Sequence, residues 1–463
     1  MKRWINSILA LAMLAGLFIP AFNLTASAAT EQYNHYYGLL HAHTSNSDGV
    51  GTYEDAYNMA RGAGLDFFAC TEHAEHFDTA KSPGNLAKGG GVNGERWKNG
   101  LAVADKLTEN GKFVAIMAYE MTWPAPDPGQ SFGHINTFNT TGYVSTNNPH
   151  YALDGGKGPQ NYYDDLAADK GAISQFNHPS AAEMPRVGFF GNFNQFGYWT
   201  PERDKAVSLI EIGNGDSRTL LFDLPRYLST GVLSPYLRFE SSYNLALSKG
   251  WHVGPTNNQD NHNANWGIAN DFRTVLLATE LTRPALYDAM TNRRVYATED
   301  KNMRVDFTIN GEVMGSILDY SPKELQVSVK ASNSNANIAR IELVTEGGKV
   351  VRSKTIRSKT AQWDFTIPAD YKYYYIKMES SFTFTAPIWV KENCSVTFDA
   401  GNGEANTTAT VKYGDTVAMP KNPVKEDYTF QGWYTETKRG EKPFDFNAGI
   451  KADTVLKAGW KKG

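Results

Sequence analysis

The sequence has few cysteines, no long apolar segment after its first residues and almost no excess of one charge. Only two cysteines, Cys70 and Cys394, occur in 463 residues, so the small domains held together by disulfides are excluded. We expect both to be inert apolar residues. The formal net charge of −4 is small for this length, which argues against a polyanion-binding surface, and we expect no nucleic-acid partner.

The N-terminus has the pattern of a secretory signal. Two basic residues precede an apolar run over residues 8–19, and the small residues Ala26-Ser27-Ala28 follow. The run is shorter than the roughly 20 residues that span a bilayer. We therefore predict a signal peptide over residues 1–28 and a secreted product without a transmembrane segment, either soluble or held non-covalently at the cell surface.

Short apolar runs alternate with longer amphipathic stretches in the first part of the remaining chain. That rhythm predicts repeated βα units around a parallel sheet over residues 29–302. Thr52 and Thr282 are expected to cap helices over residues 53–63 and 284–292. The expected strands cover residues 37–40, 65–70, 113–119, 172–176, 207–212 and 274–277.

Two β-rich regions follow the α/β region. Alternating strands, such as residues 305–309, 325–329 and 373–377, predict a β-sandwich over residues 303–391. A further strand pattern with its own turn signals predicts a separate small module over residues 394–463. The predicted fold class is therefore α/β followed by two β domains.

Histidines and acidic residues lie just after the expected strands of the α/β region. Because the carboxyl ends of parallel strands face a common side, we expect these side chains to converge there. In an extended His-X-His or Asp-X-His segment, alternate side chains share a face. The residues are His41, His43, His73, Glu120, His178, Asp260 and His262.

Imidazoles combined with a few carboxylates favour zinc, manganese or iron over calcium or magnesium, which prefer oxygen ligands. Any one of these histidines alone could be structural, but the set predicts a common metal site. We expect two or three divalent transition-metal ions. Glu72 and Glu211 are candidates for orienting the imidazoles, and surface or capping roles are an alternative for both.

The segment His41-Ala42-His43-Thr44-Ser45-Asn46-Ser47-Asp48-Gly49, followed by Thr71-Glu72-His73, resembles the opening of PHP (polymerase and histidinol phosphatase) domains. Glu120, His134 in Gly-His-Ile-Asn, His178 in Asn-His-Pro and Asp260-Asn261-His262 extend the resemblance. It implies a distorted (β/α)7 barrel, a trinuclear metal cluster and hydrolysis of phosphate esters. The implied ligands are His41, His43, Asp48, His73, Glu120, His134, His178, Asp260 and His262.

The longer arrangement, including residues 292–298 and 386–390, is most similar to the CehA/McbA-like branch, which includes a carbamate-ester hydrolase. We predict a metal-bound water as nucleophile rather than a protein side chain, because adjacent divalent ions can activate such a water. Candidate phosphate-binding residues are Arg186, Arg203, Arg273 and Arg294, among which the sequence does not choose.

The last segment resembles an internalin-type B repeat, a small β-grasp-like module of secreted and surface proteins. The resemblance rests on residues 395–401, 411–417 and 428–434 and on Ala458-Gly459-Trp460. Trp433 and Trp460 are expected to fill its core. Attachment to a cell-envelope ligand or spacing is the implied role.

Three functions are consistent with the sequence. The first is a secreted metal-dependent phosphoesterase acting on a small-molecule or wall-polymer ester. The second is a carbamate or carboxylic ester hydrolase on the same scaffold. The third is a non-catalytic cell-surface binding protein, against which the complete ligand set argues. Basic residues beside the metals would favour phosphate, whereas an apolar pocket would favour a neutral ester.

Overall fold

The structure is a computed structural model that describes residues 32–77, 94–123, 132–153, 157–179, 191–215, 237–319, 322–391, 393–412, 414–437, 440–450 and 453–463. The predicted signal peptide and Arg186 lie outside the described residues. Among the described helices, none combines the length and the apolar character that crossing a membrane requires.

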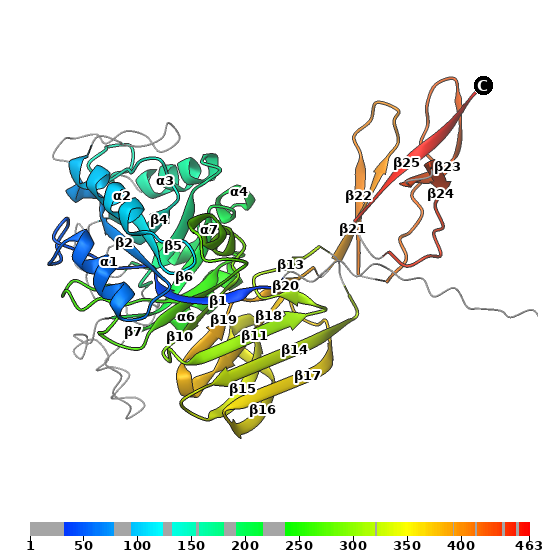
Figure 1. Ribbon diagram of the computed structural model, residues 1–463. Coiled ribbons are helices and arrows are strands. Elements are labelled where there is room, and N and C mark those ends of the chain that lie inside the picture. The colour runs from blue at the N-terminus through cyan, green and yellow to red at the C-terminus, as the bar shows by residue number, and fades with distance from the viewer. Residues whose placement is uncertain are drawn as a thin grey trace, which may run out of the picture. The chain divides into compact units, whose positions relative to one another are not determined.

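The N-terminal region contains a curled sheet with helices around it (Figure 1). Its strands are β1 (Asn34–Leu39), β2 (Phe67–His73), β3 (Val114–Trp123), β4 (Gly133–Phe138), β5 (Ile173–Asn177), β6 (Val207–Asn214), β7 (Leu237–Arg238), β8 (Gly254–Asn257), β9 (Arg273–Ala278) and β10 (Val295–Thr298). Its helices are α1 (Tyr53–Gly62), α2 (Glu95–Leu107), α3 (Lys157–Ala168), α4 (Pro201–Asp204), α6 (Glu240–Ser248) and α7 (Arg283–Thr291). All six strands expected from the sequence are present.

The sheet is mixed, so the prediction of a parallel sheet is wrong in part. β1, β2 and β3 are parallel neighbours, and β5, β6 and β8 form a second parallel group. β4 lies antiparallel between β3 and β5, and β9 runs antiparallel to β1. The parallel strands are buried on both faces, which explains their continuous apolar runs.

Threonine caps define the starts of two helices, as the sequence predicts. Thr52 accepts a hydrogen bond from the Asp55 amide, and the Asp55 carboxylate accepts one from the Thr52 amide, which is a complete capping box for α1. Thr282 accepts from the Ala285 amide at the start of α7. Both caps satisfy backbone donors that would otherwise lack an intrahelical partner.

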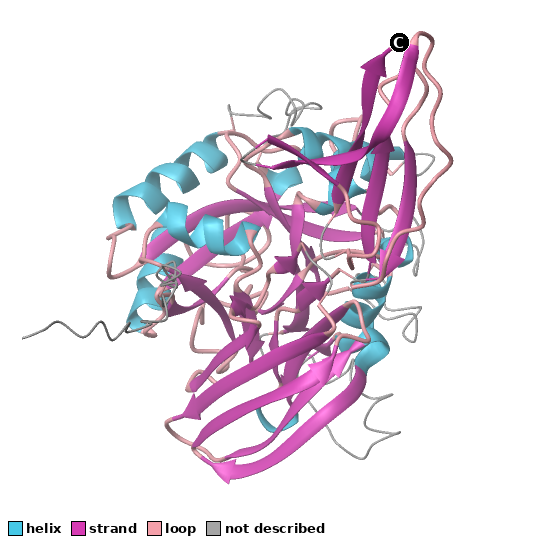
Figure 2. Cartoon of the chain, turned by 90° about the vertical axis from the view of Figure 1, so that its right-hand side faces the viewer, coloured by secondary structure: helices cyan, strands magenta, loops and turns pink. Residues whose placement is uncertain are grey.

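The second region packs two sheets together and consists mainly of strands (Figure 2). One sheet has the order β12 (Glu312–Val313), β11 (Met303–Ile309), β14 (Glu324–Asn333), β17 (Thr360–Pro368). The other contains β13 (Ile317–Leu318), β15 (Ile338–Thr345), β16 (Lys349–Ser358), β18 (Tyr373–Met378), β19 (Thr383–Thr385) and β20 (Ile388–Val390). β14 alternates buried and non-buried residues, as the sequence pattern predicts.

This second sheet continues the curled half-barrel sheet of the N-terminal region, called the barrel below, and the sequence did not predict this continuation. β19 pairs with β10 of the barrel, through Tyr296 with Thr385 and Ala297 with Phe384. One apolar core includes Leu276 and Val295 of the barrel together with Phe307 and Ile376 of the sandwich. The domain boundaries proposed from the sequence stay a prediction, since the sheet crosses the first of them.

The C-terminal region forms a five-stranded sheet in the order β22 (Thr407–Lys412), β21 (Asn393–Asp399), β25 (Thr454–Lys462), β23 (Tyr428–Thr437), β24 (Gly440–Pro443). Trp433 is buried in its core, as predicted. Trp460 is only half-buried and packs against Phe430, with a ring-centroid distance of 5.6 Å. Cys394 lies in this core and Cys70 in the barrel core, both unpaired and buried as expected.

We predict that Thr52→Ala lowers the free energy of unfolding by about 1 kcal/mol, because the first turn of α1 loses its side-chain acceptor. Chemical denaturation of the full chain, followed by circular dichroism, measures the change. Thr52→Ser retains the acceptor and is the control. Equal stability of the alanine variant and the parent chain would contradict the role of the cap.

Candidate metal centre

Six histidines and three acids converge at one end of the curled sheet. His41 and His43 follow β1, His178 follows β5, and Asp260 and His262 follow β8. His73 ends β2 and Glu120 lies near the end of β3, whereas Asp48 lies in the loop before α1. His134 is near the start of β4 and pairs with Thr122 and Asn177, so the antiparallel strand places it at the same edge.

Backbone pairing brings the His-X-His and Asp-X-His segments together. Ala42 and Asn261 form a parallel bridge. The His43 amide donates to the Asn261 carbonyl at 3.0 Å, and the Asp260 amide donates to the His41 carbonyl at 3.1 Å. Main-chain hydrogen bonds therefore hold the pair His41 and His43 beside the pair Asp260 and His262. They also bring the end of β8 next to the end of β1.

Glu120 lies at the centre of the cluster. Its Oε1 is 3.3 Å from His41 Nε2, 3.2 Å from His134 Nδ1 and 3.4 Å from His178 Nε2. Its Oε2 is 2.8 Å from His73 Nδ1 and 3.5 Å from His43 Nε2. Imidazole nitrogens thus face both carboxylate oxygens, which is the arrangement expected of a carboxylate that bridges two ions.

The two aspartates each face two histidines of the cluster. Oδ1 of Asp260 lies 3.2 Å from Nε2 of both His41 and His43. Oδ1 of Asp48 lies 3.2 Å from His262 Nε2 and 3.6 Å from His73 Nε2.

These contacts form four overlapping groups that could each hold an ion. The groups are His43, Asp48, His73, His262; His41, His43, Glu120; His41, His178, Asp260; and His73, Glu120, His134. All nine residues expected from the sequence belong to at least one group. Groups that share a residue favour neighbouring ions over isolated ones.

The donor set fits transition-metal ions. Glu120 Oε2 and Asp260 Oδ1 are buried and accept no hydrogen bond from the described residues. Such oxygens are costly to bury unless a cation compensates them. Imidazole and carboxylate ligands together suit zinc, manganese and iron.

Hydrogen bonds at the far side of the rings fix which nitrogen faces the site. His41 Nδ1 lies 2.9 Å from Oε1 of the buried Glu211 and donates to it, which directs Nε2 into the site. Ser47 donates its hydroxyl hydrogen to Glu72, and its oxygen is therefore the acceptor for His43 Nδ1 at 3.3 Å. Glu211 and Glu72 orient imidazoles in this way, Glu211 directly and Glu72 through Ser47.

Burial and neighbouring charges shift the pKa values of the cluster. Although burial opposes ionisation, the surrounding imidazoles hold the pKa of Glu120 and of Asp260 well below their ordinary values. Burial also raises the pKa of Asp48, but neighbouring histidines, mainly His262 through a hydrogen bond, outweigh it and keep this pKa low. The three carboxylates are therefore ionised at neutral pH and available as ligands.

The pKa values of the histidines differ from one another when no metal is bound. Burial lowers the pKa of His73, but the Glu120 carboxylate outweighs it and raises the pKa to about 10. Burial also lowers the pKa of His262, but the hydrogen bond with the Asp48 carboxylate outweighs it, and the pKa of His262 rises to about 9. Burial, with the charges of these two neighbours, lowers the pKa of His43 to about 3.

Two of the nine residues have left-handed backbones. His178 has φ 27° and Asp260 has φ 48°, both outside the regions that such residues usually adopt. The His178 amide donates to Glu211 Oε2 at 2.7 Å, and the Asp260 amide bonds to His41. Surrounding hydrogen bonds therefore hold the strained backbones at functional positions.

The remaining histidines lie outside the four groups. His35 lies 2.8 Å from Asp306, His150 3.3 Å from Asp165 and His252 2.6 Å from Asp204. His76 is exposed, with its ring 6.2 Å from that of His73.

The three described arginines considered as phosphate ligands have structural partners. Arg203 pairs with Asp164 and Arg294 with Asp288. The guanidinium of Arg273 is buried and donates to backbone carbonyls, including that of Phe272 at 2.6 Å.

Sequence reasoning missed three residues beside the site. Asn177 donates to Glu120 Oε1 at 2.7 Å, and Thr122 Oγ1 lies 2.7 Å from His73 Nδ1. Each lies one or two residues from a predicted ligand on its strand, and this position is the signal that could have identified them. Arg96 of α2 donates from Nη1 to the carbonyls of Asn46, at 2.7 Å, and His76, at 3.1 Å. Nothing near Arg96 in the sequence indicates this placement.

Residues 395–459 match the model of the Listeria-Bacteroides repeat domain. This segment is a Listeria-Bacteroides repeat. The finer assignment to the internalin type stays a prediction. A search with the whole sequence found no match among curated proteins.

Two solved structures are similar to the chain. One is a two-domain protein of Bacteroides vulgatus ATCC 8482, described as containing a predicted PHP-like metal-dependent phosphoesterase. The match is 15% identical, with a TM-score of 0.37, and covers 77% of this chain and 95% of that chain. The other is described as a candidate metal-dependent phosphoesterase of Bifidobacterium adolescentis ATCC 15703. It is 13% identical, with a TM-score of 0.24, and covers 49% of this chain and 88% of that chain.

We predict that the metal-free chain releases protons when it binds Mn²⁺ near neutral pH. His73 and His262, with pKa values of about 10 and about 9, are protonated there and must become neutral to act as ligands. The apparent affinity should fall from about pH 8 to about pH 6, by up to tenfold per pH unit for each proton released. Titration calorimetry in two buffers of different ionisation enthalpy measures the release, and equal heats would contradict it.

Proposed function

We propose that the chain is a metal-dependent phosphoesterase that uses a water nucleophile at a multinuclear site. The observation that carries the proposal is Glu120, which faces imidazole nitrogens with both carboxylate oxygens. Neighbouring divalent ions, when bound, supply an activated water and neutralise charge on the phosphoryl oxygens.

The residues of the chain hold and orient these ligands. Glu120 would be shared between ions, Asp260 would complete the set beside His41 and His178, and Asp48 the set beside His73 and His262. Glu211 and Ser47 keep Nε2 of His41 and His43 directed into the site. The burial of Cys70 raises the pKa of its thiol well above the ordinary value, so it is not a competing nucleophile.

Arg96 favours an anionic substrate over a neutral ester. It is exposed, and its Nη1 donates to the carbonyl of Asn46, which lies between His43 and Asp48, and to that of His76. Within the described part of the chain, Nε and Nη2 of this guanidinium have no hydrogen-bond partner. A planar guanidinium with remaining donors matches phosphate oxygens.

We further propose that the protein is exported and that its Listeria-Bacteroides repeat contacts a cell-envelope ligand. The signal-like N-terminus supports export. In the repeat, the described residues include neither a histidine nor a group that could hold a metal, which supports a role in attachment rather than catalysis. The ester substrate would then be a small molecule or a wall polymer outside the cell.

We predict that His43→Ala lowers both bound metal and hydrolysis of p-nitrophenyl phosphate, the activity by at least about a hundredfold. Elemental analysis and rates before and after chelation measure both. His150→Ala removes an exposed histidine outside the site and is the matched control. Full activity with unchanged metal content in His43→Ala would contradict the assignment of the site.

We predict that Arg96→Ala raises KM for p-nitrophenyl phosphate about tenfold or more, because the anion loses a charge-assisted partner. The hydrolysis of 1-naphthyl N-methylcarbamate should change less. Lys98→Ala removes an exposed cation from the same helix and is the control. A parent enzyme that prefers the carbamate, together with equal effects of Arg96→Ala on both substrates, would favour a neutral-ester hydrolase.

A further inference from the structure

A second cavity lies at the end of the barrel opposite the metal centre. Trp199 precedes β6, and Gly250 and His252 precede β8, so these residues are near the amino ends of their strands. The metal-site residues instead follow the carboxyl ends of β1, β5 and β8. The other wall comes from the sandwich and includes Tyr373 and Trp389. The cavity is therefore separate from the site described above.

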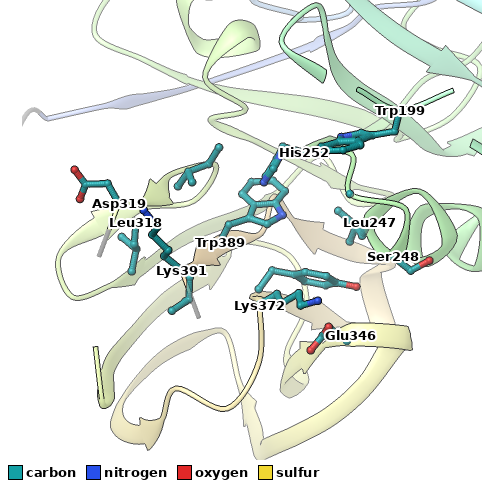
Figure 3. A pocket seen from close by; sticks show the side chains of 14 residues that line it. Trp199, Leu247, Ser248, His252, Leu318, Asp319, Glu346, Lys372, Trp389 and Lys391 are labelled. Carbon is teal, nitrogen blue, oxygen red and sulfur yellow. The ribbon is translucent and has the colours of Figure 1, made fainter. Parts of the chain in front are cut away.

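The cavity has a volume of about 660 Å³, in the range of small-molecule sites, and both aromatic and aliphatic side chains line it. Figure 3 shows Trp199, His252 and Trp389 next to one another. Trp199 is 37% exposed although it is a large apolar residue. Its indole lies against Gly250, where a Cβ would come within 3.2 Å of Cε2. The ring is thus supported by the backbone and still accessible.

His252 is held in a fixed orientation at the cavity wall. Asp204 accepts from the His252 amide at 2.7 Å and lies 2.6 Å from its Nδ1. Its ring packs edge-on against Trp389, with a centroid distance of 4.8 Å. No described residue bonds to Nε2. Asp204 therefore leaves Nε2 as a polar group for a ligand.

The outer part of the cavity carries charges of both signs. Asp319 and Glu346 lie on opposite sides of it in Figure 3, and Lys372 and Lys391 also line it. Such a mixture would not select an anion or a cation. A lipid chain would place apolar groups against these polar side chains. A neutral ligand with many hydroxyl groups can donate to the carboxylates and accept from the ammonium groups.

We propose that this cavity binds a sugar ring of a neutral oligosaccharide. The apolar C–H face of the ring packs on the Trp199 indole, whose π face carries partial negative charge. The hydroxyl groups at its edge bond to His252 Nε2 and to the charged groups. The site is distinct from the phosphoesterase site and would hold the protein on a glycan while hydrolysis proceeds at the other end of the barrel.

Titration calorimetry of the full chain with cellotetraose, maltotetraose and chitotetraose tests the proposal. We expect one-to-one binding of at least one of them, weakened about tenfold or more by Trp199→Ala and retained by Trp199→Phe. Val350→Ala, at an exposed apolar residue of β16, is the control. No binding by any of the three, or equal binding by Trp199→Ala, would overturn the proposal.

The two sites can be tested separately. Since the cavity lies away from the metal ligands, His43→Ala should bind the oligosaccharide with unchanged affinity. Trp199→Ala should retain its metal content and its rate on p-nitrophenyl phosphate. Loss of oligosaccharide binding in His43→Ala would place the sugar at the metal centre and overturn the assignment of this cavity.

Discussion

The pairing of the segment after β1 with the segment after β8 is the constraint on which the metal centre depends. Two main-chain hydrogen bonds join His41 and His43 to Asp260 and Asn261. This pairing curls the sheet, so that strands from widely separated parts of the chain direct their ligands to one place. It also holds the left-handed backbone of Asp260, whose amide donates to the His41 carbonyl.

Around this pairing the chain concentrates charge in a buried volume. Carboxylates and imidazoles offset only part of the free-energy cost of burying one another, since two carboxylate oxygens accept no hydrogen bond from the described residues. A cation completes such an arrangement, and binding it would contribute to folding as well as to chemistry. The supporting groups, Glu211, Glu72 and Ser47, orient the rings of His41 and His43 before any ion arrives.

The sequence was sufficient to name the nine residues that the structure brings together, and not the sheet that carries them. These residues could be identified because each follows or ends a short apolar run, or lies in a recognisable motif. β4 was missed because its six residues include His134 and Asn136, which disguise a buried strand. The antiparallel direction of β9 and the contacts of Arg96 are set by tertiary pairing between distant segments, and no local pattern encodes them. The role of Glu72 needed the loop of Thr44 and Ser47 to fold back onto it.

The junction between barrel and sandwich has a consequence for how this architecture can change. The three-residue strand β19 covers the edge of β10, which would otherwise present unpaired amides and carbonyls. A shortened chain ending near residue 302 would expose that edge and half of a shared apolar core, and edges of this kind invite pairing with other chains. The sandwich thus protects this edge from pairing with other chains. Recombination between genes would therefore have to transfer the barrel and the sandwich together.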